Sequence, residues 1–188
     1  MRNLWISIIL LLIVLVTLGA AARALKPGDK APGFKLMDED MKYVTLQEEL
    51  KKGPVLLVFY LFDFTEACHR QMEDFEKIQK DYSQMKLQVY GVSVDSPFAH
   101  KAWRGENKIQ FKLLSDFNKE ASQSYGAYFP DLMGLKGVSK RAVFLIGQDG
   151  KIKYAQVSDK PQQLPDVDKA RQALNSLGGI KPVLKKKK

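Results

Sequence analysis

An unbroken apolar run over residues 55–60 constrains the fold of this chain more than any other stretch. Its β-branched and aromatic residues predict a strand that is buried on both faces. Further along, apolar side chains recur at spacings of three or four, which places them on one face of a helix. They are Cys68, Met72, Phe75, Ile78 and Tyr82. The sequence therefore predicts a strand, a short loop and a helix whose first turn carries the single cysteine.

The predicted position of Cys68 has chemical consequences. A helix N-terminus carries about half a positive charge and several N–H groups without intrahelical acceptors, and both stabilise a thiolate. Because the thiolate is the nucleophilic form of cysteine, a thiol placed there becomes reactive. The alternative is a buried structural cysteine, which packs as a small apolar side chain.

The residues before Cys68 exclude one kind of redox site and indicate another. They read T-E-A-C where a thioredoxin has C-x-x-C, so dithiol exchange within one site is impossible. The pattern F-Y-x-x-D-F with T-x-x-C, over residues 59–68, resembles the peroxiredoxins of the alkyl hydroperoxide reductase and thiol-specific antioxidant (AhpC/TSA) family. Residues 140–152 resemble the arginine-bearing strand and hairpin of that family, and the resemblance extends over residues 25–177.

The resemblance implies an α/β protein with the three-layer thioredoxin-like fold, in which helices cover both faces of a central mixed β-sheet. The alternation of strands and helices independently predicts a sheet that contains parallel strands and is covered on both faces. A hairpin is expected on either side of the acidic turn Asp38-Glu39-Asp40, which is expected to be solvated. Residues 128–136 are expected to be irregular, and residues 166–177 to form the closing helix.

The resemblance also implies a thiol-dependent peroxidase that reduces hydrogen peroxide or organic hydroperoxides. Cys68 would be the nucleophile, the Thr65 hydroxyl would accept the peroxide proton, and Arg141 would stabilise the thiolate and the transition state. By its position, Thr65 is also a candidate N-cap. The residues expected to line or support the site are Leu61, Phe64, Ala67 and Gln71. Leu61 stands where the family has a proline, which restores a backbone N–H and frees φ.

A chain with one cysteine cannot close an intramolecular disulfide. The resemblance implies a one-cysteine mechanism, closest to the bacterioferritin-comigratory and mycobacterial one-cysteine groups. The oxidised Cys68 would be reduced by an external thiol, from a thioredoxin-like protein or a small molecule, or would pair with a second subunit of a homodimer. No cofactor is implied. His69 and His100 have no paired carboxylate or second thiol, make a poor metal site, and are expected at the surface.

The N-terminus predicts export. Residues 4–22 are almost wholly apolar, Arg2 precedes them, and Ala22-Arg23-Ala24 is a candidate cleavage site. Residues 1–24 are therefore either a cleaved signal peptide or, because the run is near the length that crosses a bilayer, an N-terminal membrane anchor. A cleaved signal or an outward-facing anchor places the domain of residues 25–180 outside the cytoplasm, as a periplasmic or otherwise extracytoplasmic protein, with a basic tail at residues 181–188. An anchor that leaves the domain facing the cytoplasm is the third alternative.

The net charge of +9 does not indicate nucleic-acid binding. Arg2, Arg23 and residues 185–188 supply six of the positive charges, which leaves +3 for the remainder. Aromatic and basic residues are not interleaved as in a nucleic-acid groove. Two other functions remain open: a non-peroxidase thiol or carrier protein that assists exported redox or haem proteins, and a degenerate structural domain held at the membrane.

Overall fold

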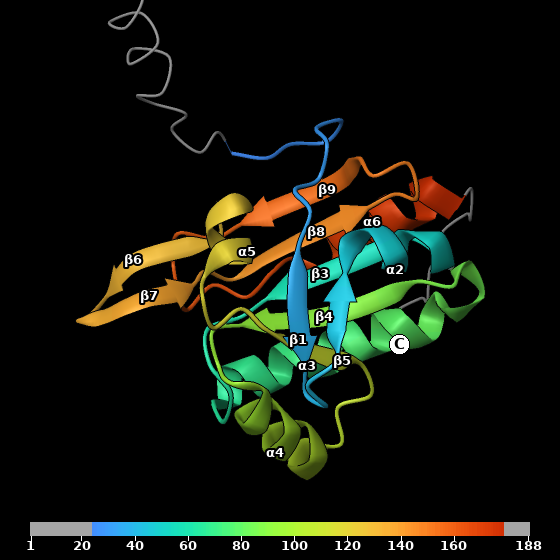
Figure 1. Cartoon of the computed structure of the whole chain (residues 1–188). Coiled ribbons are helices and arrows are strands. Elements are labelled where there is room, and N and C mark those ends of the chain that lie inside the picture. Colours follow the sequence, from blue (N-terminus) through green and yellow to red (C-terminus); the bar gives the residue numbers. More distant parts are fainter. Residues whose placement is uncertain (1–23, 179–188) are drawn as a thin grey trace, which may run out of the picture.

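The structure, a computed structural model, describes residues 24–178 (Figure 1). The leader expected over residues 1–24, apart from its last residue, and the basic tail expected over residues 181–188 lie outside the described residues. Between residues 24 and 178, no helix has both the length and the apolar character needed to cross a membrane.

A single mixed sheet of seven strands, in the order β2-β1-β5-β4-β3-β8-β9, forms the middle layer (Figure 1). Its strands are β1 (Lys35–Asp38), β2 (Tyr43–Thr45), β3 (Val55–Phe59), β4 (Gln88–Ser93), β5 (Lys112–Ser115), β8 (Ala142–Ile146) and β9 (Ile152–Val157). β3, β4 and β5 run parallel, whereas β1 and β8 lie antiparallel to their neighbours. The expected central mixed sheet is confirmed.

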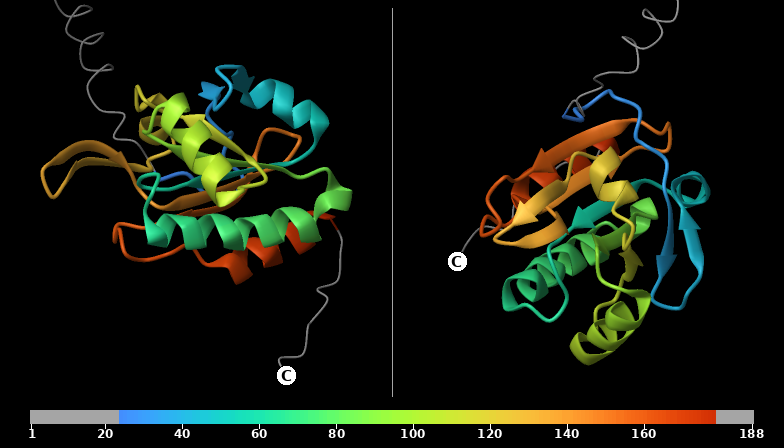
Figure 2. Two further views of the ribbon diagram at one scale, coloured as in Figure 1. Left: turned by 90° about the horizontal axis from the view of Figure 1, so that it is seen from below. Right: turned by 60° about the vertical axis from the view of Figure 1, so that its left-hand side comes forward.

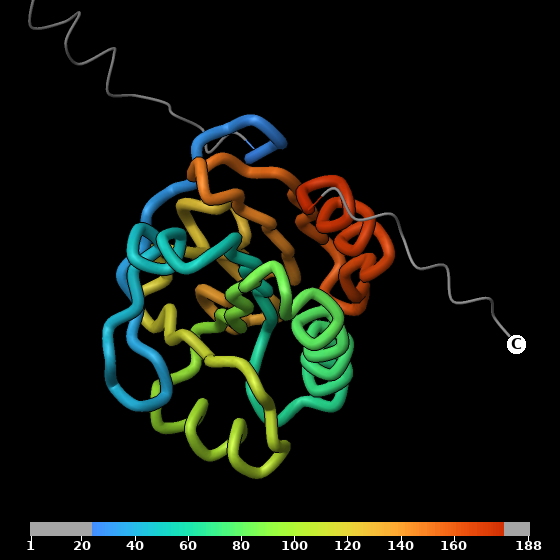
Figure 3. The backbone as a smooth tube through the Cα atoms, turned by 90° about the vertical axis from the view of Figure 1, so that its right-hand side faces the viewer, coloured from blue at the N-terminus to red at the C-terminus, as the bar shows by residue number. Residues whose placement is uncertain are grey.

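Helices cover both faces of this sheet, as the three-layer prediction requires. They are α2 (Leu46–Lys52), α3 (Glu66–Asp81), α4 (Pro97–Asn107), α5 (Glu120–Ser124) and α6 (Val167–Gly178), with a short 3-10 turn, η1 (Ser83–Met85). α3, α6 and Trp103 of α4 pack into one apolar core, while Leu46 of α2 and Ala121 of α5 pack into the other. Figures 2 and 3 show α3 and α6 side by side on one face.

The strand predicted over residues 55–60 is the centre of the sheet. All residues of β3 are buried, because helices lie over both of its faces and β4 and β8 flank its edges. Its antiparallel register with β8 pairs Phe59 with Ala142. This register brings the start of β8 beside the end of β3, and therefore beside the loop that leads to Cys68.

The stretch expected to be irregular is instead a second, two-stranded sheet, so that prediction is wrong. β6 (Tyr128–Leu132) and β7 (Leu135–Ser139) pair as a hairpin that extends away from the main sheet (Figure 1). Its loop consists of Met133 and Gly134, with φ of 53° and 90°. Positive φ at both positions suits a two-residue hairpin turn, but methionine is not among the residues that signal one.

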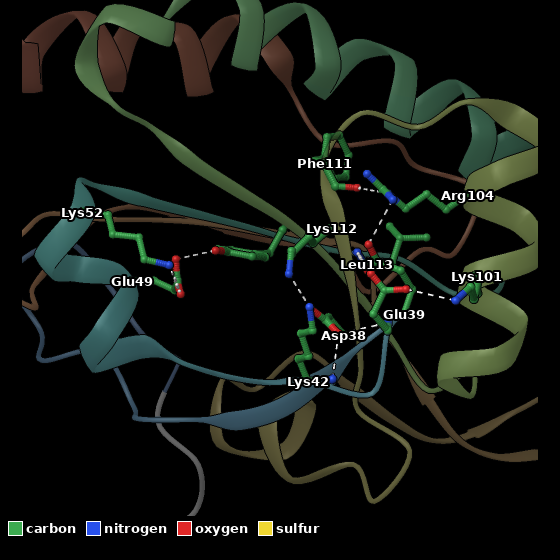
Figure 4. A network of polar contacts seen from close by, with 12 residues as sticks. Asp38, Glu39, Lys42, Glu49, Lys52, Lys101, Arg104, Phe111, Lys112 and Leu113 are labelled. Atoms are coloured by element: carbon green, nitrogen blue, oxygen red, sulfur yellow. Dashed lines mark hydrogen bonds and ion pairs between the residues drawn. The ribbon is translucent and has the colours of Figure 1, made fainter.

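The acidic turn between β1 and β2 is also not solvated as expected. Asp38 and Glu39 are buried, and Figure 4 shows the basic side chains around them. Asp38 forms an ion pair with Lys112, and Glu39 forms one with Arg104 at 3.1 Å. Only Asp40 lies near solvent, at 3.1 Å from Lys101. The turn therefore ties β1 to α4 and β5.

Candidate active site

Cys68 lies in the first turn of α3, where the sequence predicts it, and its side chain is 0% exposed. The loop from Tyr60 to Thr65 leads into this turn from the end of β3. Cys68 packs among the apolar residues of one core, including Leu61 and Met72. Because the sulfur is wholly buried, bulk water does not reach it. Any polar group that contacts it therefore acts in surroundings of low dielectric constant.

Arg141 supplies that polar group. It stands directly before β8, and the pairing of β8 with β3 places it at the end of β3. Its Nη1 donates a hydrogen bond to Cys68 Sγ at 3.3 Å, across more than seventy positions of sequence. The guanidinium is itself buried. Since arginine stays protonated in proteins, the sulfur faces a permanent positive charge.

Two further hydrogen bonds fix the direction of this guanidinium. Nη1 also donates to Gln71 Oε1 at 2.7 Å, and Nε donates to the carbonyl oxygen of Pro161 at 2.6 Å. Gln71 in turn donates from Nε2 to the carbonyl oxygen of Phe59 at 3.0 Å. Gln71 therefore links the end of β3, the first turns of α3 and the arginine. The contact with Pro161 comes from the segment between β9 and α6, which the sequence did not indicate.

Thr65 occupies the N-cap position of α3, with φ of −109°, but its side chain makes no capping hydrogen bond. Its hydroxyl donates instead to the carbonyl oxygen of Phe62 at 3.1 Å. The residue is exposed, so this hydroxyl is open to solvent on the outer side of the loop. A hydroxyl that donates one bond keeps its lone pairs for accepting another.

The other expected support residues differ in their positions. Leu61 is buried in the same core as Cys68, and Ala67 is half-buried. Phe64 points outward and is 58% exposed, with a φ of 56°. That left-handed conformation is rare and strained for a bulky residue. Leu61 therefore belongs to the apolar core that buries the sulfur, whereas the Phe64 ring lies at the surface.

The expectation that His100 lies at the surface is wrong, since it is fully buried on α4. Its Nδ1 lies 2.9 Å from Asp63 Oδ2, and Tyr60 donates to the other oxygen of Asp63 at 2.8 Å. Burial, and then the charge of Asp63, raise the pKa of Tyr60 well above its ordinary value, so its hydroxyl stays protonated. His69 is half-buried on α3 and lies 3.6 Å from Glu73.

Neither histidine belongs to a metal site of the usual kind. Between residues 24 and 178, no group of at least three histidine, cysteine, aspartate or glutamate side chains is placed to hold a metal ion. The chemistry that the site offers is therefore that of a buried sulfur, a fixed guanidinium and the free N–H groups of a helix start.

Comparison with known proteins identifies the family. The profile of the AhpC/TSA family matches residues 27–155, more than half of the chain, so this protein belongs to the AhpC/TSA family. The chain is similar to the chloroplastic 2-cysteine peroxiredoxin of Chattonella marina var. antiqua, with 34% identity over 72% of each chain. It is 31% identical to alkyl hydroperoxide reductase C of Helicobacter pylori, over 73% of this chain and 70% of that protein.

Solved structures agree with this assignment. The peroxidoxin BcpB of Mycobacterium tuberculosis superposes with a TM-score of 0.71 and 26% identity, over 84% of this chain and 99% of that one. The reduced 2-Cys peroxiredoxin of Plasmodium vivax gives a TM-score of 0.71 and 29% identity, over 81% and 82% of the two chains. The chain spans only 52% of the length of the BAS1 peroxiredoxins of Spinacia oleracea and Arabidopsis thaliana.

Proposed function

We propose that this protein is a thiol-dependent peroxidase that reduces hydrogen peroxide or organic hydroperoxides at Cys68. The thiolate attacks one peroxide oxygen, an S–O bond forms as the O–O bond breaks, and the leaving oxygen takes a proton and departs as water or an alcohol. Cys68 becomes a sulfenic acid. The observation that carries the proposal is the 3.3 Å hydrogen bond from Arg141 to Cys68 Sγ inside a dry core.

Each neighbouring group has a defined task in this step. Arg141 stabilises the negative charge that begins on sulfur and moves to the leaving oxygen, and its position needs no rearrangement because Gln71 and Pro161 hold it. The Thr65 hydroxyl donates to Phe62 and is exposed at the start of α3, so it can accept a hydrogen bond from the attacked peroxide when the loop admits it. The N–H groups of Ala67 and Cys68, at the helix start, are available as further donors.

We propose a one-cysteine mechanism for the second half of the reaction, since the chain holds no other cysteine. An external thiol attacks the sulfenic sulfur, releases water and leaves a mixed disulfide, and a second thiol then restores Cys68. A thioredoxin-like protein or a small thiol fits this role. Because Cys68 is fully buried, the loop before it and the first turn of α3 must open before a peroxide or a thiol can reach the sulfur.

Exposed aromatic rings near the site favour a homodimer as the functional form. Phe64, Phe98 and Phe117 follow the ends of β3, β4 and β5 and are 58%, 72% and 60% exposed. The carboxyl ends of parallel strands meet at one edge of a sheet, so these rings lie on the same side of the molecule. Exposed aromatic rings of this kind are typical of protein interfaces.

We further propose that the domain acts outside the cytoplasm. This rests on the apolar residues 4–22 and the candidate cleavage site at Ala24. The full-length chain, expressed in a bacterium and fractionated, should appear in the periplasm if cleaved, or in the membrane fraction with its domain open to protease added to spheroplasts if anchored. Recovery of uncleaved protein from the cytoplasm would exclude both forms.

The test of the proposed function uses protein that begins at Leu25. With dithiothreitol as reductant it should consume hydrogen peroxide or an organic hydroperoxide, and the Cys68→Ser variant should not. Equal inactivity of the two proteins would remove the enzyme proposal. Stable mixed disulfides between Cys68 and client proteins, without peroxide turnover, would favour a carrier protein that assists exported redox or haem proteins.

A further inference from the structure

A cluster of buried polar side chains lies beneath the loop that leads to Cys68. Asp63 comes from this loop, His100 from α4, and Asp95 from the segment between β4 and α4. Asp63 and His100 are buried, and Asp95 is mostly so. Burying groups of this kind costs free energy unless each finds a partner. The proposed reaction uses none of them.

Both oxygens of the Asp63 carboxylate are held by side chains. Tyr60 donates to Oδ1 at 2.8 Å, and His100 Nδ1 lies 2.9 Å from Oδ2. Because a carboxylate only accepts, Nδ1 carries the hydrogen and donates it. The second ring nitrogen, Nε2, is buried without a hydrogen-bond partner. A hydrogen on Nε2 would be an unsatisfied donor, so the geometry favours placing the ring hydrogen on Nδ1.

The backbone of Asp63 is held as well. Its N–H donates to Asp95 Oδ2 at 3.0 Å, and the Ser93 hydroxyl donates to the same oxygen at 2.6 Å. Ser115 donates to the carbonyl oxygen of Asp95 at 2.6 Å, which fixes that segment to the end of β5. Asp63 is therefore anchored directly to α4 through His100, and through Asp95 to β4 and β5.

The residue that follows Asp63 explains why such anchoring is needed. Phe64 has a φ of 56° and a largely exposed ring. Packing of its side chain therefore does little to offset the strain of this backbone conformation. Immediately afterwards Thr65 begins α3, and Cys68 follows in the first turn. Leu61, three residues before Phe64, leaves its own φ free. The strained turn therefore relies on contacts made by neighbouring residues.

We propose that Asp63 and His100 are positioning residues for Cys68. By holding Asp63 at both carboxylate oxygens, His100 and Tyr60 keep the Phe64 turn in its strained form and so set Thr65 and the sulfur relative to Arg141. His100 acts through Asp63 and does not take part in the bond changes. The effect on peroxide reduction rests on the proposed function, but the effect on the exposure of Cys68 does not.

The test compares variants that remove one donor to Asp63 with a control that does not. His100→Leu and Tyr60→Phe each remove a donor, His100→Asn restores an amide donor near the position of Nδ1, and Trp103→Phe is the control. Trp103 lies on the same helix as His100 and against the same ring of Tyr60, at 5.4 Å between ring centroids, without bonding to Asp63.

Alkylation of Cys68 by iodoacetamide is the first measurement, followed by mass spectrometry on protein shown to be folded by circular dichroism. Loss of a hydrogen bond to a charged group should raise the alkylation rate about tenfold in His100→Leu. It should rise less in Tyr60→Phe and stay near the wild-type rate in His100→Asn and Trp103→Phe. If His100→Leu does not fold, Tyr60→Phe decides the question.

The rate of Cys68 oxidation by peroxide is the second measurement, and it should fall in the same variants in which alkylation rises. Wild-type alkylation rates in both donor variants, or equal increases in Trp103→Phe, would overturn the positioning role. If wild-type protein does not react with peroxide at all, the proposed function fails, and the alkylation series still decides the role of Asp63 and His100.

Discussion

The guanidinium of Arg141 makes three hydrogen bonds, and one of them reaches Cys68. The other two bind the carbonyl oxygen of Pro161 and the amide oxygen of Gln71, so the charge is aimed at the sulfur before any peroxide arrives. A lysine at this position would keep one charge but lose the planar fork that serves several acceptors at once.

Arg141→Lys should therefore slow the oxidation of Cys68 by peroxide about 100-fold, the loss typical of removing one fixed donor from a transition state. Stopped-flow fluorescence or quenched-flow mass spectrometry measures this rate. Arg171→Lys is the matched control, because Arg171 pairs with Asp81 on the surface at 2.6 Å, away from the site. A rate in Arg141→Lys equal to that of the control would contradict the role of the guanidinium.

Gln71 affects stability as well as reactivity. Gln71→Leu should lower the free energy of unfolding by about 1–3 kcal/mol, because it leaves the buried carbonyl oxygen of Phe59 and the Arg141 donor without this partner. Urea denaturation measures the change. Gln79→Leu, on the same helix but only half-buried, should change the stability much less. Similar losses in both variants would argue against the bridging role of Gln71.

The positions of some site residues can be predicted from the sequence and those of others cannot, and the difference has a physical reason. Cys68 and its helix follow from local periodicity, whereas Arg141 follows only from the family resemblance, which places an arginine directly before a buried strand. The surface position predicted for His100 is wrong because its burial depends on Asp63 and Tyr60, which stand 37 and 40 positions earlier in the chain. A polar residue is recognised as buried only when its partners are known, and these partners are set by tertiary contacts.

Among the elements, the β1–β2 turn contributes stability that depends on pH. Burial raises the pKa of Asp38, but the Lys112 ammonium and two backbone N–H groups outweigh it, so the pKa lies below the ordinary value of 3.8. A group whose pKa is lowered in the folded state stabilises the protein above its unfolded pKa. That contribution is lost as the pH falls through the folded pKa.

Asp38→Asn should accordingly be less stable than wild type at neutral pH, and the difference should shrink as the pH is lowered below 3.8. Urea titrations at several pH values measure it. Asp40→Asn serves as the control, since Asp40 is exposed and its pairing with Lys101 is screened by water. A difference that stays constant from neutral pH to pH 3 would show that the ionised form of Asp38 is not the stabilising one.

Elements that are buried in the core are easier to predict from the sequence than elements at the surface. β3 and the face of α3 follow directly from the sequence, because each is packed in a way that leaves a clear apolar pattern. The β6–β7 hairpin leaves no such pattern, since it lies outside the main sheet and carries exposed Met133 and Leu135 at its tip. Pro130 inside β6 argues further against a strand, yet an edge strand tolerates it.

The loops and helix starts that follow β3, β4 and β5 carry both Cys68 and the exposed Phe64, Phe98 and Phe117. Phe98→Glu combined with Phe117→Glu should convert the proposed dimer to a monomer, because two charges would have to be buried in the interface. Analytical ultracentrifugation of reduced protein measures this. Tyr43→Glu, which changes an equally exposed aromatic residue on β2, should leave the association state unchanged. Wild-type protein that is monomeric at every concentration would remove the dimer proposal.

The proposed activity depends above all on a buried sulfur that a fixed guanidinium makes reactive towards peroxide. The most direct measurement is a single turnover: reduced protein is mixed with one equivalent of hydrogen peroxide, quenched within seconds, treated with a sulfenic-acid trap and analysed by mass spectrometry. We expect a trapped sulfenic acid on Cys68, formed much more slowly in Arg141→Lys. A Cys68 that remains a thiol over this time, or that reacts no faster than free cysteine, would contradict it.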